Sequence, residues 1–75
     1  MTEDIKKEIL EEIKNNNIYE IIAMLNYHNI NVIEEYDDNM RVVGFSFYGG
    51  YIGIDSDMNI TEHNLLDERE DNKDV

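Results

Sequence analysis

The chain has 75 residues, no cysteine, and a formal net charge of −12 at pH 7 from 18 acidic and six basic residues. This length predicts one domain with a small core, and the lack of cysteine excludes a disulfide framework and thiolate metal sites. No apolar run approaches the roughly 18 residues of a membrane span. The negative charge disfavours contact with an anionic membrane or directly with nucleic acid. The N-terminus does not resemble a signal peptide, so we expect a cytoplasmic protein.

Two helices are predicted at the start of the chain. Thr2 can cap the first, whose polar side carries lysines among glutamates in positions that favour pairing. Its apolar residues repeat at helical spacing: Ile5, Ile9, Leu10 and Ile13. The run Asn15–Asn17 ends this helix, and Asn17 with Glu20 forms a capping box for the second. The second helix is more apolar, so we expect it to be the central packing helix, ending at His28 or Asn29.

The strongest local pattern is 42–54, in which Gly49 and Gly50 are flanked by β-branched and aromatic residues. We predict a hairpin with these glycines as a two-residue type I′ turn, because both positions of that turn need a positive φ. The resulting cross-strand pairs are Tyr48 with Tyr51, Phe47 with Ile52, Ser46 with Gly53, and Phe45 with Ile54. Side chains alternate between the two faces of a strand, so the phenylalanines and isoleucines form the core face. The other face carries Gly44, Ser46, Gly53 and the paired tyrosines Tyr48 and Tyr51.

Further strands are predicted on both sides of this hairpin. The four expected strands are 30–36, 40–48, 51–55 and a short 60–63, joined outside the hairpin by Asp- and Asn-rich turns. The sequence therefore predicts an α+β fold, with two N-terminal helices packed on one face of a three- to four-stranded antiparallel β-meander. We expect a single domain over 1–66 and a disordered acidic tail over 67–75, since the tail has no hydrophobic period.

No motif in the sequence indicates catalysis or a cofactor. Asp55, Asp57 and Asn59 have the spacing of the first calcium-loop ligands, but Ile60 and Leu66 stand where that loop needs Gly and Glu. A turn between strands explains the same residues. The only histidines are His28 and His63, and a zinc site would need carboxylates for its remaining ligands. We therefore predict no metal site, no cofactor, no catalytic residue and no enzymatic activity.

The distribution of charge is the most informative feature. Between Asn15 and His63 the chain has one Lys or Arg, Arg41. The acids of the same segment are Glu20, Glu34, Glu35, Asp37, Asp38, Asp55, Asp57 and Glu62. Such a one-signed surface repels itself, and it can reflect selection for solubility or halophilic adaptation. Alternatively, the carboxylates meet a basic protein surface that normally holds nucleic acid, where they stand in for phosphates.

In size and composition, as a short, acidic, cysteine-free domain rich in Asn and Ile, the chain resembles small phage-encoded inhibitors, including anti-CRISPR and antirestriction proteins that imitate DNA. This resemblance implies a viral, non-enzymatic inhibitor in the host cytoplasm, bound to a basic, nucleic-acid-binding protein. Tyrosine is enriched at protein interfaces, and turn carboxylates can be spaced like phosphates. The expected partner-binding residues are Glu34, Glu35, Asp37, Asp38, Tyr48, Tyr51, Asp55 and Asp57. The alternative is a small homodimeric structural or regulatory module whose acidity serves solubility.

Overall fold

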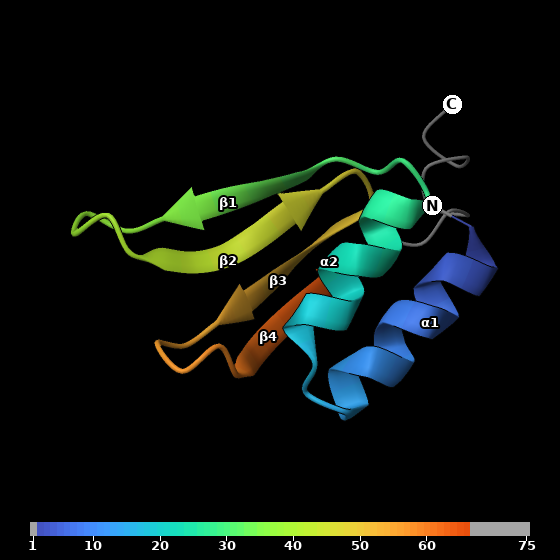
Figure 1. Ribbon diagram of the computed structural model, residues 1–75, viewed down its shortest axis with the longest axis horizontal. Coiled ribbons are helices and arrows are strands. Elements are labelled where there is room, and N and C mark those ends of the chain that lie inside the picture. Colours follow the sequence, from blue (N-terminus) through green and yellow to red (C-terminus); the bar gives the residue numbers. More distant parts are fainter. Residues whose placement is uncertain (1, 67–75) are drawn as a thin grey trace.

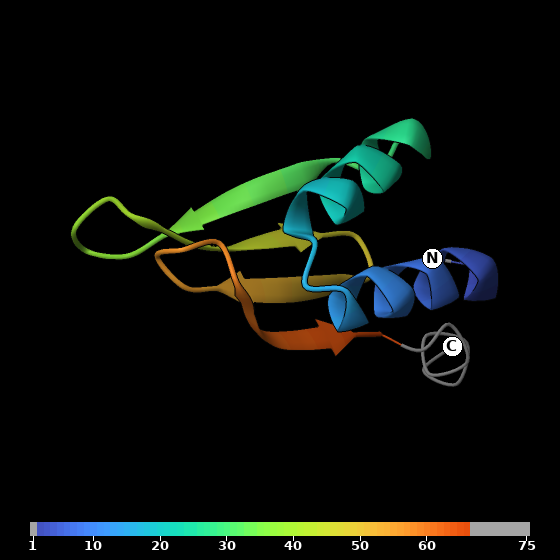
Figure 2. The same ribbon diagram turned by 60° about the horizontal axis from the view of Figure 1, so that its bottom comes forward.

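The computed structural model describes residues 2–66 and contains two helices followed by one antiparallel sheet (Figure 1). The elements are α1 (Glu3–Lys14), α2 (Ile18–Tyr27), β1 (Val32–Tyr36), β2 (Val42–Phe47), β3 (Gly50–Ile54) and β4 (Ile60–Leu65). The strands lie side by side in chain order, and both helices cover the same side of the sheet (Figures 1 and 2). The predicted α+β meander is confirmed, with a fourth strand longer than expected. The predicted tail, 67–75, lies outside the described residues.

Both helices begin at the predicted capping residues. The Thr2 hydroxyl and the Asn17 amide oxygen accept hydrogen bonds from first-turn N–H groups, at 3.3 and 3.2 Å. The C-caps, Asn15 and His28, are each followed by an asparagine with left-handed backbone geometry, Asn16 with φ 54° and Asn29 with φ 62°. Asparagine tolerates this conformation better than most residues with a β-carbon, which explains why asparagines follow both helices.

Asn16 also ties the helices to the sheet. Its side-chain nitrogen donates to the Asn59 side-chain oxygen at 2.7 Å, and its side-chain oxygen accepts from the Ile60 backbone N–H at 2.7 Å. One amide thereby joins the connection between α1 and α2 to the first residue of β4. These bonds span 43 and 44 residues of sequence and help to set where the helices lie along the sheet.

The core lies between the helices and one face of the sheet. Its buried residues are Ile9, Ile18, Ile21, Leu25, Phe45, Phe47, Ile52 and Ile54. Three of the four helical members belong to α2, which confirms that α2 is the central packing helix. The sheet members are the four residues predicted for the core face. No polar or charged side chain is buried among residues 2–66, so the core there is held by apolar packing alone.

The predicted register of the central hairpin was wrong by two residues. Phe47 pairs with Gly50 and not with Ile52, so the two-residue loop is Tyr48-Gly49. Only Gly49 of that loop has a positive φ, 112°, which excludes the predicted type I′ turn. Because the shift is an even number, every side chain stays on its predicted face. Tyr51 pairs with Ser46, and the expected pair of tyrosines does not form.

The position of β4 explains this difference. Gly50 pairs with Leu65, so β4 continues two residues beyond its predicted end at His63. A β-carbon on Gly50 would lie 2.6 Å from the backbone oxygen of Asn64, so only glycine fits at this close approach. Gly50 is therefore needed inside the sheet and not in the turn.

Candidate functional site

The face of the sheet opposite the helices is uncovered among residues 2–66 (Figure 2). On this outer face, strand pairing places four residues in one row across all four strands: Glu35, Gly44, Gly53 and Glu62. The adjacent row consists of Ile33, Ser46, Tyr51 and Asn64. The first row therefore has a carboxylate at each end and no side chain in its two central positions.

Tyr51 fills the space above these two glycines. If Gly44 carried a β-carbon, its nearest neighbour would be the Tyr51 hydroxyl, and a β-carbon on Gly53 would lie 3.4 Å from the Tyr51 ring. The hydroxyl donates a hydrogen bond to the backbone oxygen of Val43 at 3.3 Å. The ring thus lies over the two glycines, and Tyr51 stays partly exposed on a sheet face that no described element covers.

The two carboxylates of the row lean toward this ring. Glu35 accepts a hydrogen bond of 2.6 Å from the Ser46 hydroxyl, which holds it over β2. The Glu62 side chain lies over β3, with its γ-carbon 2.6 Å from the position of a β-carbon on Gly53. Partial burial raises the pKa of Tyr51, and the negative charges of Glu62 and Glu35 raise it further. The tyrosine therefore lies in a negative field with a carboxylate on each side.

The predicted turn acids gather at one end of the sheet, where the β1–β2 and β3–β4 turns both lie (Figure 1). Asp37 and Asp55 have a structural role, because one carboxylate oxygen of each accepts two backbone N–H groups of its own turn at 2.8–2.9 Å. The N–H of Asn59 is the main cause that lowers the pKa of Asp55. Asp38 and Asp57 are exposed, and their carboxylates accept no hydrogen bond within residues 2–66. Of the four turn aspartates, Asp38 and Asp57 are therefore the two with carboxylates free of hydrogen bonds within the described residues.

The remaining predicted residues do not share one surface. Glu35 and Tyr51 lie together on the outer face, whereas Glu34 alternates with Glu35 and lies on the helix side of β1. Glu34 accepts a hydrogen bond of 3.2 Å from the Tyr36 hydroxyl, which is the main cause of the raised pKa of Tyr36. Tyr48 is 80% exposed in the β2–β3 turn, at the end of the sheet opposite the turn acids. The structure thus divides the predicted set among the outer face, the helix side of β1 and the two ends of the sheet.

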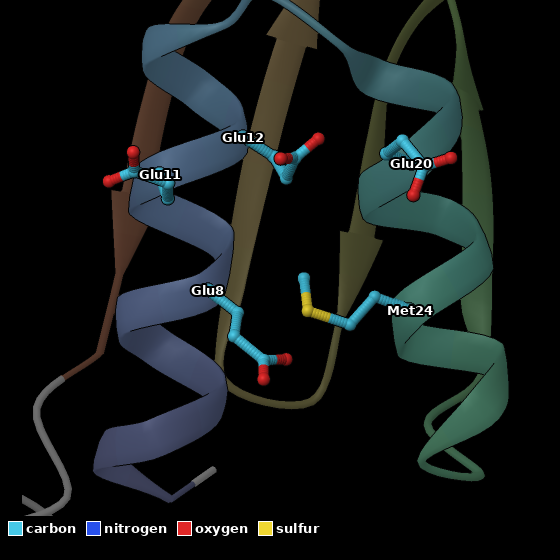
Figure 3. Close-up of a pocket in the computed structure, with 5 residues that line it drawn as sticks. All are labelled: Glu8, Glu11, Glu12, Glu20 and Met24. Carbon is cyan, nitrogen blue, oxygen red and sulfur yellow. The ribbon is translucent and has the colours of Figure 1, made fainter.

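An acidic groove between the helices was not predicted. Glu8 and Glu12 lie on the side of α1 that faces α2, while Glu20 and Met24 line the groove from α2 (Figure 3). The four-residue spacing within each pair places its members on one helix face, and this pattern could have indicated the groove. His28, at the end of α2 as predicted, lies 3.8 Å from Glu8. That is the only carboxylate contact of a basic side chain within 4.0 Å among residues 2–66, so the expected lysine–glutamate pairs are not seen there.

The structure supports the interpretation of 55–59 as a turn, since the Asp55 carboxylate is engaged by the turn's own N–H groups. His63 is exposed on β4, and no three His, Asp or Glu side chains converge as a metal site over 2–66. None of the helices described is long and apolar enough to cross a membrane.

Comparison with protein-family models, curated proteins and solved structures gives no match to this chain. Two surfaces of the described residues carry carboxylates in a defined arrangement: the outer face around Tyr51, and the end of the sheet with the turn acids Asp37, Asp38, Asp55 and Asp57.

Proposed function

We propose that the protein is a non-enzymatic inhibitor that binds the basic, nucleic-acid-binding surface of another protein, in the manner of phage-type DNA mimics such as anti-CRISPR and antirestriction proteins. Its place of action would be the host cytoplasm. The observation that carries this proposal is uncompensated negative charge: Arg41 is the only Lys or Arg from Asn15 to Leu66. Within residues 2–66, the one basic side chain within 4.0 Å of a carboxylate is His28, beside Glu8.

Uncompensated charge gives a thermodynamic reason for a basic partner. Carboxylates without nearby cations repel one another and destabilise the compact state. A partner rich in Lys and Arg supplies the missing cations, and complementary charge also accelerates the encounter. The same lack of cations argues against direct nucleic-acid binding, which depends on several contacts from Lys or Arg to phosphates.

The perturbed titratable groups favour a binding role over catalysis. A catalytic acid or base is expected in a cleft, with its pKa shifted by burial and specific partners. Asp55 is instead partly exposed and Tyr36 exposed, and hydrogen bonds within a turn and along one strand are the main causes of their pKa shifts. Tyr51 lies on an open sheet face. None of the three has the setting of a general acid or base.

A competition experiment tests this function. The full chain, immobilised, is incubated with host lysate at low and high salt, and each captured protein is then tested for binding to duplex DNA with and without the chain. We expect a basic protein that is captured only at low salt and loses its DNA when the chain is added. Captured proteins that keep their DNA at saturating chain would contradict the proposal. The chain alone should not shift DNA in a gel at low salt.

One observation favours the alternative, a homodimeric module. Ile33 is 60% exposed on edge strand β1 and lines an open groove of about 530 Å³ with Phe47 and Tyr48. Exposed apolar residues beside an unpaired strand edge are typical of association surfaces. Light scattering separates the two functions: a dimer that Ile33→Lys converts to monomer supports the module, whereas a monomer at all concentrations supports the inhibitor.

A further inference from the structure

The outer face has the features of a binding site for one planar cation. The Tyr51 ring lies over Gly44 and Gly53, which have no β-carbons that would displace it from the sheet surface. Glu35 and Glu62 lie on opposite sides of it and lean toward it over β2 and β3. An aromatic face attracts a cation, and carboxylates beside the ring can accept the hydrogen bonds of that cation.

We infer that this face binds an arginine side chain of the basic partner, with the guanidinium stacked on Tyr51 and hydrogen-bonded to Glu35 and Glu62. The inference rests on the proposed function and names its contact surface. It adds Glu62 to the expected contact residues, because pairing with Gly53 brings Glu62 into the same row as Glu35. It also gives Tyr51 a different role from Tyr48, which lies in the turn and is 80% exposed.

The geometry favours arginine over lysine. A guanidinium is planar, stacks on an aromatic ring, and presents donors along its edges toward carboxylates on two sides. A lysine ammonium is a compact, strongly hydrated charge that gains less from a flat ring. Because Tyr51 is partly exposed on the uncovered face of the sheet, a planar group can approach its ring from the solvent side.

The same charges disfavour a second copy of the chain as the occupant. Two outer faces packed together would bring the Glu35 and Glu62 carboxylates of both copies into one interface. The two rows of the outer face that strand pairing defines contain no Lys or Arg to neutralise them. Like charges buried opposite one another cost free energy, whereas arginine from a basic partner removes the repulsion.

The test uses the isotope-labelled full chain and two peptides of equal charge, hexa-arginine and hexa-lysine, followed by NMR. We expect hexa-arginine to bind about two- to fivefold more tightly than hexa-lysine, as for an exposed cation–π contact. The largest shifts should fall on the Tyr51 ring and on the amides of Gly44 and Gly53. Equal affinity for the two peptides would overturn the inference.

Matched variants distinguish this specific arginine site from non-specific electrostatic attraction. Replacing both Glu35 and Glu62 by Gln should weaken the affinity for hexa-arginine about fivefold or more. The control replaces Glu11 and Glu20 by Gln, which removes the same charge from exposed helix positions. This control should change the affinity less than about twofold. Tyr51→Ala removes the ring and should abolish the preference for hexa-arginine over hexa-lysine. Equal effects of the two Gln pairs, or NMR shifts confined to Asp38 and Asp57, would overturn the inferred arginine site. The proposed function would then still stand. If neither peptide binds, both the arginine site and the proposed function are overturned.

Discussion

Tyr51 lies across the sheet on Gly44, with its hydroxyl where a β-carbon of Gly44 would be. The two residues are diagonal neighbours on strands β2 and β3, since Tyr51 pairs with Ser46, and Gly44 pairs with Gly53. Aromatic side chains reach this diagonal position, and here the ring covers backbone that two paired glycines would otherwise expose. The glycines therefore leave the space over the sheet that the tyrosine ring occupies.

This relationship predicts a non-additive pair of substitutions. Gly44→Ala should displace the ring, break its hydrogen bond to Val43 and cost about 1–3 kcal/mol, as overpacking does. In a Tyr51→Ala background, the same Gly44→Ala change should cost much less, because the obstructing atoms are gone. Urea unfolding of the single and double variants measures the coupling. Strictly additive costs would show that the two side-chain positions do not compete.

Phe47 and Tyr48 should differ sharply in their effect on stability. Phe47 is 8% exposed in the core, whereas the adjacent Tyr48 is 80% exposed in a turn. We expect Phe47→Ala to cost about 3–5 kcal/mol and Tyr48→Ala about 0.5 kcal/mol or less. Chemical denaturation of both variants is the measurement. Equal losses would mean that Tyr48 is covered by a second copy of the protein in solution.

The faces of the hairpin could be predicted from the sequence, but its turn could not. Alternation of apolar and small residues fixes which side chains point to the core, and an even shift in register leaves that pattern unchanged. Choosing between Gly49-Gly50 and Tyr48-Gly49 depended on where β4 ends, which is a contact outside the hairpin. The requirement for glycine at position 50 comes from the Asn64 backbone, and local sequence does not contain that information.

The candidate site was predicted only in part, again because the pairing of β4 cannot be read from local sequence. Glu35 and Tyr51 were expected to contact a partner, and they do lie on one face. Glu62 was missed as a contact residue because its place beside Gly53 depends on the pairing of β4. The structural role of Asp37 could have been foreseen, since aspartate at the start of a turn commonly accepts nearby backbone N–H groups.

The similar β1–β2 and β3–β4 turns predict a stabilising substitution. Met40 and Met58 each occupy the last position of an Asp-initiated turn, with φ of 63° and 67°, where a residue with a β-carbon is strained. Met40 is 78% exposed, so Met40→Gly should relieve this strain and raise stability by up to about 1 kcal/mol. Met58 packs against the core, so Met58→Gly should gain less or lose stability. Denaturation midpoints that fall equally for both variants would contradict this account.

Asp55 should contribute to stability in a pH-dependent way that Asp57 does not share. Hydrogen bonds from backbone N–H groups, chiefly that of Asn59, hold the folded pKa of Asp55 below its ordinary value of 3.8. The contribution is therefore present above that value and is lost as pH falls through the lower folded pKa. Asp55→Ala should lower the Tm at pH 7, and the gap from the original chain should close in strong acid. Asp57→Ala is the control, and a gap for Asp55→Ala that persists unchanged at pH 2 would refute the ionic origin.

Turn-end charges should govern the rate of partner binding, while the outer face governs its lifetime. Asp38 and Asp57 are exposed and free of hydrogen bonds to their carboxylates within residues 2–66, so reversing them to Lys leaves the turns intact, unlike reversal of Asp37. Charges at the rim of an interface act mainly by steering, which salt screens, whereas central contacts act on dissociation. Against the captured basic partner, Asp38→Lys and Asp57→Lys should slow association more than Glu11→Lys, and the difference should vanish at high salt. Glu35→Gln should mainly speed dissociation. If Glu11→Lys slows association as much as the turn variants do, attraction depends on net charge alone and the turn end has no special role.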